Sequence, residues 1–113
     1  MNQKKVVFIL SSSNNQNAIK RMDEFRKHGI DVEGYGFKRH ESSNISAEGI
    51  HINEIGAYDN SMSYKSRIPI IRRGVLEVIR IYKHSDVLFY LFGLDVAGMF
   101  RLQSSKPYIY EEE

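Results

Sequence analysis

A polar segment at residues 11–17, Ser-Ser-Ser-Asn-Asn-Gln-Asn, follows directly after the apolar run at residues 6–10. Short hydroxyl and amide side chains beside the unpaired N–H groups of a helix start suit a phosphate or a sugar hydroxyl. The same residue types also turn a chain and cap a helix, which is the alternative interpretation. The segment contains no glycine, the residue that lets a backbone approach a pyrophosphate, so it is not a dinucleotide fingerprint. We predict a ligand-binding loop whose candidate residues are Ser12, Ser13, Asn14, Asn15 and Asn17.

Basic side chains gather between residues 60 and 84, where Glu77 is the only acidic residue against six cations: Lys65, Arg67, Arg72, Arg73, Arg80 and Lys83. One interpretation is the solvated face of an amphipathic helix. The other is attraction to a lipid diphosphate or to anionic membrane head groups. Arg67, Arg72 and Arg73 lie at or near the start of the predicted helix, where the helix dipole disfavours cations. These three arginines are therefore the candidates for an anionic partner.

The chain ends in three glutamates, and Glu113 is the candidate catalytic carboxylate. At the functional edge of a sheet a carboxylate could bind a hydroxyl or take a proton; a solvated end is the alternative. No metal site is predicted, because cysteine is absent and no two histidines have helical ligand spacing: His28, His40, His51 and His84.

Length, composition and charge narrow the classes of protein to which this chain could belong. A chain of 113 residues with 42% hydrophobic and 27% charged residues predicts one small globular domain. The net charge of +2 does not indicate nucleic acid as a partner. The apolar run near the N-terminus is too short for a signal peptide or a membrane span. We expect a cytoplasmic protein, with peripheral contact to the inner face of the membrane as a further expectation.

The pattern predicts five strands and three helices. Continuous apolar runs, typical of strands buried on both faces, indicate parallel pairing. The predicted strands are residues 6–10, 30–37, 50–55, 87–92 and 106–110, and the predicted helices are residues 18–28, 68–84 and 95–103. Loops are expected at residues 38–48 and 56–67.

Four residues are expected to mark the ends of these helices or their packing on the sheet. Gly29 is expected to end the first helix in the left-handed conformation. Pro69 suits the first turn of the second helix, where its missing N–H costs nothing. Gly74 weakens that helix, which indicates close packing on the sheet. Asp95 is the expected cap of the third helix.

The resulting fold class is α/β, an open, mainly parallel five-stranded sheet of Rossmann type with helices on both faces. It is expected to occupy residues 1–113 as one domain. The chain stops at the carboxyl end of the fifth strand, where such sheets place their functional loops. We therefore expect half of a larger architecture.

Three segments carry a family likeness: KVVFIL at residues 5–10 with the polar loop and helix, SDVLFY at residues 85–90, and KPYIYE at residues 106–111. In order and spacing they resemble the N-terminal domain of family 4 glycosyltransferases, which are two-domain GT-B enzymes. The likeness spans essentially the whole chain. Two departures exist, since many members have a glycine-rich loop after the first strand and a histidine six residues after the proline. Here those positions hold residues 12–15 and Glu113.

The resemblance implies retaining transfer of a sugar from a nucleotide-sugar donor to a glycan or lipid-linked acceptor held mainly by this half. The polar loop would then bind the acceptor, and the donor would bind to a C-terminal domain that this sequence lacks. The fragment alone is expected to be inactive and to carry no cofactor. The alternative is a self-contained flavodoxin-like ligand-binding or signalling module, whose phosphate loop would be residues 11–17.

Overall fold

The computed structural model describes residues 5–13, 15–39, 51–58 and 62–112 of the chain. Asn14, Glu113 and most of the loop predicted at residues 38–48 lie outside the described residues. The elements in chain order are β1 (Lys5–Leu10), α1 (Gln16–Lys27), β2 (Val32–Arg39), β3 (Ile52–Tyr58), α2 (Tyr64–Ile81), β4 (Val87–Phe92), α3 (Leu94–Gln103) and β5 (Tyr108–Glu111).

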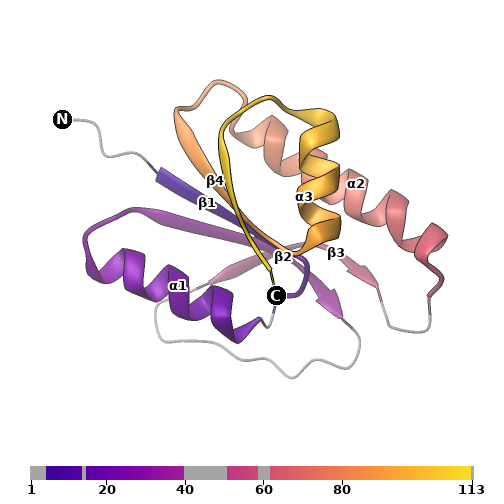
Figure 1. Ribbon diagram of the computed structural model, residues 1–113, viewed down its shortest axis with the longest axis horizontal. Helices are drawn as coiled ribbons and strands as arrows, with labels where there is room; N and C mark the ends of the chain where they lie inside the picture. The colour runs from indigo at the N-terminus through magenta and orange to yellow at the C-terminus, as the bar shows by residue number, and fades with distance from the viewer. Residues whose placement is uncertain (1–4, 14, 40–50, 59–61, 113) are drawn as a thin grey trace.

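The five strands form one sheet in the order β3-β2-β1-β4-β5, and every neighbouring pair is parallel. α1 covers one face of the sheet, while α2 and α3 cover the other (Figure 1). The predicted open, parallel, Rossmann-like α/β sheet with helices on both faces is therefore confirmed.

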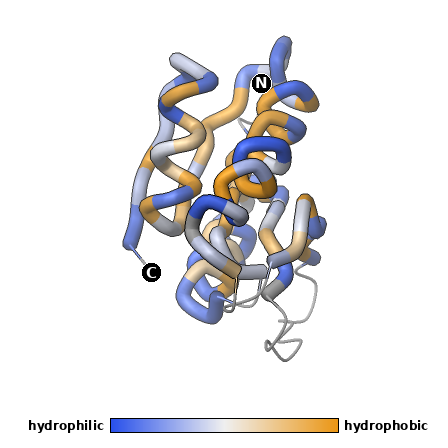
Figure 2. Tube along the Cα trace, turned by 90° about the vertical axis from the view of Figure 1, so that its right-hand side faces the viewer, coloured by the Kyte–Doolittle hydropathy of each residue, from blue (hydrophilic) through white to orange (hydrophobic). Residues whose placement is uncertain are grey.

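β1 lies at the centre of the sheet and contributes to both layers of the core. Val7 and Ile9 pack toward α2 and α3, whereas Val6, Phe8 and Leu10 pack toward α1. Alternate strand residues point to opposite faces, so a strand covered on both sides must be apolar throughout. Blue and orange stretches alternate along the helices in Figure 2, as expected for helices that bury one side.

α2 begins four residues earlier than predicted and ends at Ile81 rather than residue 84. Ser63 is its N-cap, and the side-chain oxygen of Ser63 accepts from the Ser66 amide at 3.3 Å. Pro69 is therefore the sixth helical residue and lies in the second turn, so its placement in the first turn was wrong. The loop predicted at residues 56–67 was also wrong at both ends, because β3 extends to Tyr58.

The remaining boundaries shift by a few residues. β2 begins at Val32, two residues after the predicted start. Gly93, rather than Asp95, is the N-cap of α3. Gly29 has a φ of 82°, which confirms its left-handed role after α1. Gly74 packs closely on the sheet as predicted, since a Cβ there would lie 2.6 Å from the Phe37 ring.

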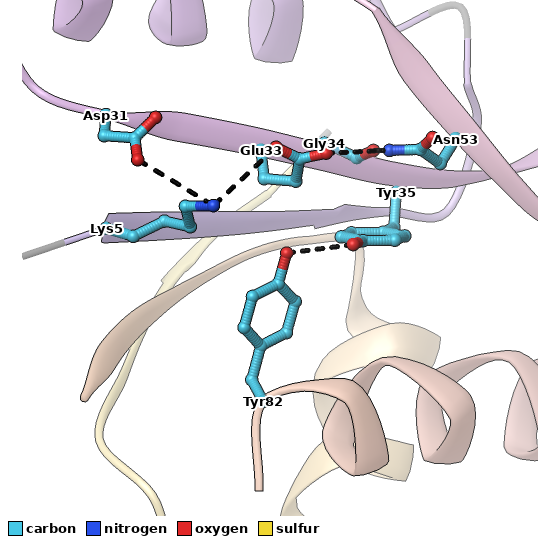
Figure 3. A network of polar contacts seen from close by, with 7 residues as sticks. All are labelled: Lys5, Asp31, Glu33, Gly34, Tyr35, Asn53 and Tyr82. Atoms are coloured by element: carbon cyan, nitrogen blue, oxygen red, sulfur yellow. Dashed lines mark hydrogen bonds and ion pairs between the residues drawn. The ribbon is translucent and has the colours of Figure 1, made fainter. Parts of the chain in front are cut away.

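The amino ends of the strands carry a polar network with a structural role (Figure 3). The Lys5 ammonium lies 3.8 Å from an Asp31 oxygen and 4.0 Å from a Glu33 oxygen. Below it, the buried hydroxyls of Tyr35 and Tyr82 are 2.9 Å apart and satisfy each other. Burial, followed by the hydrogen bond to Tyr35, raises the pKa of Tyr82. These groups join β1, β2 and α2 at the edge opposite the carboxyl ends of the strands.

Candidate functional site at the carboxyl edge of the sheet

The carboxyl ends of β1 and β4 are where the connections of the chain diverge. After β1 the chain passes to α1 on one face, and after β4 it passes to α3 on the opposite face. The two strands are neighbours, with Leu10 opposite Phe92. Adjacent parallel strands whose connections leave in opposite directions open a crevice, the usual ligand position in such sheets. The topology thus places the candidate site just after β1 and β4.

Hydrogen bonds from three neighbouring strands hold the segment after β1. The Ser11 amide donates to the Phe92 carbonyl at 3.0 Å, and the Ser13 amide donates to the Phe37 carbonyl at 2.9 Å. The Tyr58 hydroxyl donates to the Ser11 carbonyl at 2.8 Å. The start of the predicted ligand loop is therefore positioned by β2, β3 and β4, which makes it a rigid wall for a site.

A hollow of about 950 Å³ opens at this point, between the carboxyl edge of the sheet and the outer side of α3. Its volume is in the range of small-molecule sites. It is lined by the end of β1, one side of α3 and the end of β5: Ser11, Gly93, Leu94, Asp95, Gly98, Met99, Arg101, Leu102, Tyr110 and Glu112.

The lining combines acidic groups with exposed apolar side chains. Asp95 and Glu112 supply two carboxylates, whereas Arg101 supplies one guanidinium. Leu94 and Leu102 are 77% and 81% exposed, so they offer open apolar surface. Carboxylates accept hydrogen bonds from hydroxyls, and an acidic excess repels phosphate. The hollow therefore suits a neutral, hydroxyl-rich molecule whose C–H faces contact apolar side chains.

Asp95 lies in the first turn of α3, where a negative charge is favourable beside the helix N-terminus. Its Oδ1 accepts from the Val96 amide at 2.9 Å. A carboxylate has two oxygens with about four acceptor positions, so Asp95 can bind a ligand hydroxyl as well. Asp95 was predicted to cap α3, but Gly93 is the N-cap and Asp95 instead lines the hollow.

The structure distributes the predicted loop residues along the start of α1. Asn15 is the N-cap of α1, and its side chain accepts from the Ala18 amide at 3.1 Å. Ser12 is buried, Ser13 is half-buried, and Asn17 is exposed on α1. Among the described residues of this segment, Ser11 alone lines the hollow. The capping interpretation thus holds for Asn15, while Ser12 and Ser13 lie one and two residues from the hollow wall.

The structure separates Arg67 from Arg72 and Arg73. The Arg67 guanidinium carbon lies 5.4 Å from the centre of the Tyr58 ring, and the residue is half-buried. Arg72 and Arg73 are exposed near the middle of α2. The argument that all three cations oppose the helix dipole was therefore wrong for Arg72 and Arg73, because the dipole acts within the first turn.

A second polar contact lies at the same edge on the α1 face of the sheet. The Tyr90 hydroxyl donates to Glu111 Oε1 at 2.5 Å, and Arg21 lies 3.4 Å from the same oxygen. Burial, followed by this hydrogen bond, raises the pKa of Tyr90 to about 12. The contact anchors β5 to β4 and α1 through side chains.

Raising the pH from 10 to 12 should destabilise the wild-type protein more than the Tyr90→Phe variant. The folded state holds the Tyr90 proton up to about pH 12, whereas an unfolded tyrosine releases it near 10.0. A raised folded-state pKa stabilises the fold below pH 10, and this contribution is lost as the pH rises through the folded pKa. Urea unfolding at both pH values measures the difference. Equal losses in the two proteins would contradict the raised pKa of Tyr90 in the folded state.

Sequence reasoning missed the α3 part of the hollow and Tyr110 in β5. Leu94, Gly98 and Leu102 recur every four residues, which is the signal for one side of a helix. Tyr110 and Glu112 alternate in the last strand, which is the signal for one side of a sheet. Both patterns were readable, but only the pairing of β4 with β5 brings these two sides together.

No group of three or more metal-ligating side chains occurs within the part of the chain that the structure describes. Among the helices described, none is both long and apolar enough to cross a membrane. No family model, curated protein or solved structure matches this chain.

Proposed function

We propose that this chain is the acceptor-binding domain of a glycosyltransferase and that it holds a neutral, hydroxyl-rich glycan in the hollow beside α3. The composition of the hollow carries the proposal. Asp95 and Glu112 offer acceptor oxygens at the divergence of β1 and β4, next to apolar side chains and only one cation. The sequence likeness to the N-terminal domain of family 4 glycosyltransferases supports the reaction class.

In this proposal Asp95 accepts a hydrogen bond from an acceptor hydroxyl and orients it, while Leu94 and Tyr110 contact the sugar ring. A second α/β domain supplies the nucleotide-sugar donor and the groups that stabilise the departing nucleotide. The chain alone therefore binds acceptor without transferring sugar. Glu113, the catalytic candidate, stays a prediction because it lies outside the described residues.

The proposed location is the cytoplasm. Exposed Arg72 and Arg73 extend the proposal to lipid-linked acceptors, because they could meet anionic head groups at the inner face of the membrane. The two acidic side chains disfavour an anion such as a flavin phosphate in the hollow itself. The proposal thus assigns neutral and anionic parts of an acceptor to different surfaces.

Asp95→Asn should weaken glycan binding at least about tenfold, because a hydrogen bond to a charged group is lost. The asparagine oxygen can still accept from the Val96 amide, so the fold should be preserved. Amide chemical shifts during titration with neutral methyl glycosides and disaccharides measure the affinity. Glu77→Gln, which removes an exposed acid from α2, is the matched control and should bind like the wild type. Equal affinity for Asp95→Asn and the wild type would contradict the role of Asp95.

A further inference from the structure

The backbone holds the last strand of the sheet only weakly at its carboxyl end. β5 has four residues and, among the described strands, pairs with β4 alone. Its last residue pair joins Glu111 to Phe92. The Gly93 amide donates to the Glu111 carbonyl at 3.3 Å, a distance longer than the usual value of about 2.9 Å. Segments with few contacts open more readily than the interior of a sheet, so the end of β5 needs a further restraint.

Side chains on the α1 face of the sheet supply that restraint. The Tyr90 hydroxyl donates to Glu111 Oε1 at 2.5 Å, and Arg21 Nη2 lies 3.4 Å from the same oxygen. Arg21 also pairs with Glu24, whose Oε2 lies 3.2 Å from Arg21 Nη1. The negative charge of Glu111 is the main cause that raises the pKa of Arg21. Tyr90, Arg21 and Glu111 form the β5 clasp, which joins β4, α1 and β5.

The β5 clasp is anchored in the packed core. Tyr90 is buried, and its ring stacks on Phe8 at 4.8 Å and on Phe92 at 5.2 Å. It also meets the Phe25 ring edge-on at 5.8 Å. The Tyr90 hydroxyl therefore has a fixed position, and Glu111 is the group that the hydrogen bond restrains. A hydrogen bond to a carboxylate is roughly twice as strong as one between neutral groups, whereas a half-exposed ion pair contributes less.

Glu112, the residue after the clasp, belongs to the hollow on the opposite side of the sheet. It follows directly after β5 and lines the hollow together with residues of α3, whereas Glu111 contacts α1. Successive side chains of an extended chain point to opposite sides, which accounts for this division. Within the described part of the chain, no hydrogen bond or ion pair holds the Glu112 side chain. The position of Glu112 is therefore set by the residue before it.

We propose that Glu111 is a positioning residue: the β5 clasp holds the end of β5 so that the Glu112 carboxylate stays in the wall of the hollow. Glu111 acts through Glu112 rather than by touching the ligand. Contacts on the α1 face thereby set the geometry of a site on the α3 face. The ligand is the neutral glycan of the proposed function, on which this part of the inference rests. The restraint on β5 itself can be measured without any ligand.

Hydrogen exchange of the ligand-free chain tests the restraint, with the amides of β1 as the internal reference. Tyr90→Phe should speed exchange of the β5 amides that bond to β4 about tenfold, because a hydrogen bond to a charged group is lost. Arg21→Met should speed it about two- to fivefold, as expected for a half-exposed ion pair. Arg26→Met is the matched control and should leave β5 unchanged, since Arg26 is also 40% exposed on α1 but pairs with Asp23. Equal β5 exchange in Tyr90→Phe and the wild type would overturn the proposal.

Affinity for neutral methyl glycosides tests whether the restraint acts through Glu112. Glu112→Gln should weaken binding about tenfold, and Arg21→Met should weaken it about two- to fivefold. The double variant should bind like Glu112→Gln alone, because loosening β5 matters only through that carboxylate. Additive losses, or an unchanged affinity in either single variant, would overturn the proposal. A wild type that binds no glycoside would instead contradict the proposed function, and the exchange rates would then decide whether the clasp holds β5.

Discussion

Phe8→Ala is expected to lower the free energy of unfolding by about 3–5 kcal/mol, the range for an aromatic side chain lost from a core. Phe8 is fully buried at the centre of β1. Its ring stacks on Tyr90 at 4.8 Å and on Phe92 at 6.2 Å, and it meets the edge of Phe25 at 5.6 Å. One ring therefore joins β1, β4 and α1. A small domain has about 5–15 kcal/mol of stability in total, so the loss removes a large part of it.

Phe8→Leu is the control, since it keeps most of the buried volume and should cost about 1–2 kcal/mol. Urea denaturation followed by circular dichroism measures both variants on the same scale. The alanine variant should have the much lower midpoint with a similar slope. Equal midpoints for alanine and leucine would show that the α1 face of the core does not depend on this ring.

Gly74→Ala should destabilise the protein by about 1–3 kcal/mol, the usual cost of overpacking, although alanine is the better helix former. A Cβ at residue 74 would lie 2.6 Å from two carbons of the Phe37 ring and 2.9 Å from the Ile55 carbonyl oxygen. The ring is fully buried and the oxygen is backbone, so neither can retreat cheaply. α2 would have to move away from β2 and β3.

Gly98→Ala makes the same substitution in α3, where we expect it to stabilise the protein rather than destabilise it. A Cβ at residue 98 meets no atom within 4 Å, so the change affects helix propensity alone. The free energy of unfolding of this variant should rise by up to about 1 kcal/mol. Thermal and urea unfolding measure the stability of both variants. The difference between them compares the cost of close packing at residue 74 with the gain in helix propensity at residue 98. A stabilised Gly74→Ala variant would contradict the close approach of α2 to the sheet.

Continuous apolar runs made the central strands predictable. Residues 6–10 and 87–92 are apolar at every position, and both strands are buried on both faces as that pattern requires. Gly34 and Gly36 obscured β2, because glycine weakens a strand pattern. Their role is spatial: a Cβ at Gly34 would lie 2.6 Å from the end of Met22, and one at Gly36 would lie 3.0 Å from Ser13. Such approaches join distant segments and leave no mark in local sequence.

The position of the candidate site was predictable from the sequence, but only some of the residues that line it were. The end of β1 was identified because polar residues follow a buried strand there. The C-terminal glutamates were placed at this edge as a group, and Glu112 lines the hollow. Tyr110 was not identified, since its place in the hollow depends on which strand β5 joins. Asp95 was assigned to capping because its residue type fits both roles. Residue type defines what a side chain can bind, whereas strand order decides what lies beside it.

Titration of the isotope-labelled chain with three classes of ligand tests the proposed acceptor site most directly. Neutral glycosides should shift the amides of Gly93 and Gly98, which line the hollow, with dissociation constants of about 1 mM or weaker. Uridine and guanosine nucleotide-sugars, and FMN, should leave these amides unshifted at equal concentrations. Saturable binding of a nucleotide-sugar or of FMN with a dissociation constant of about 10 µM would contradict the proposed acceptor site. So would glycosides that shift no amide around the hollow.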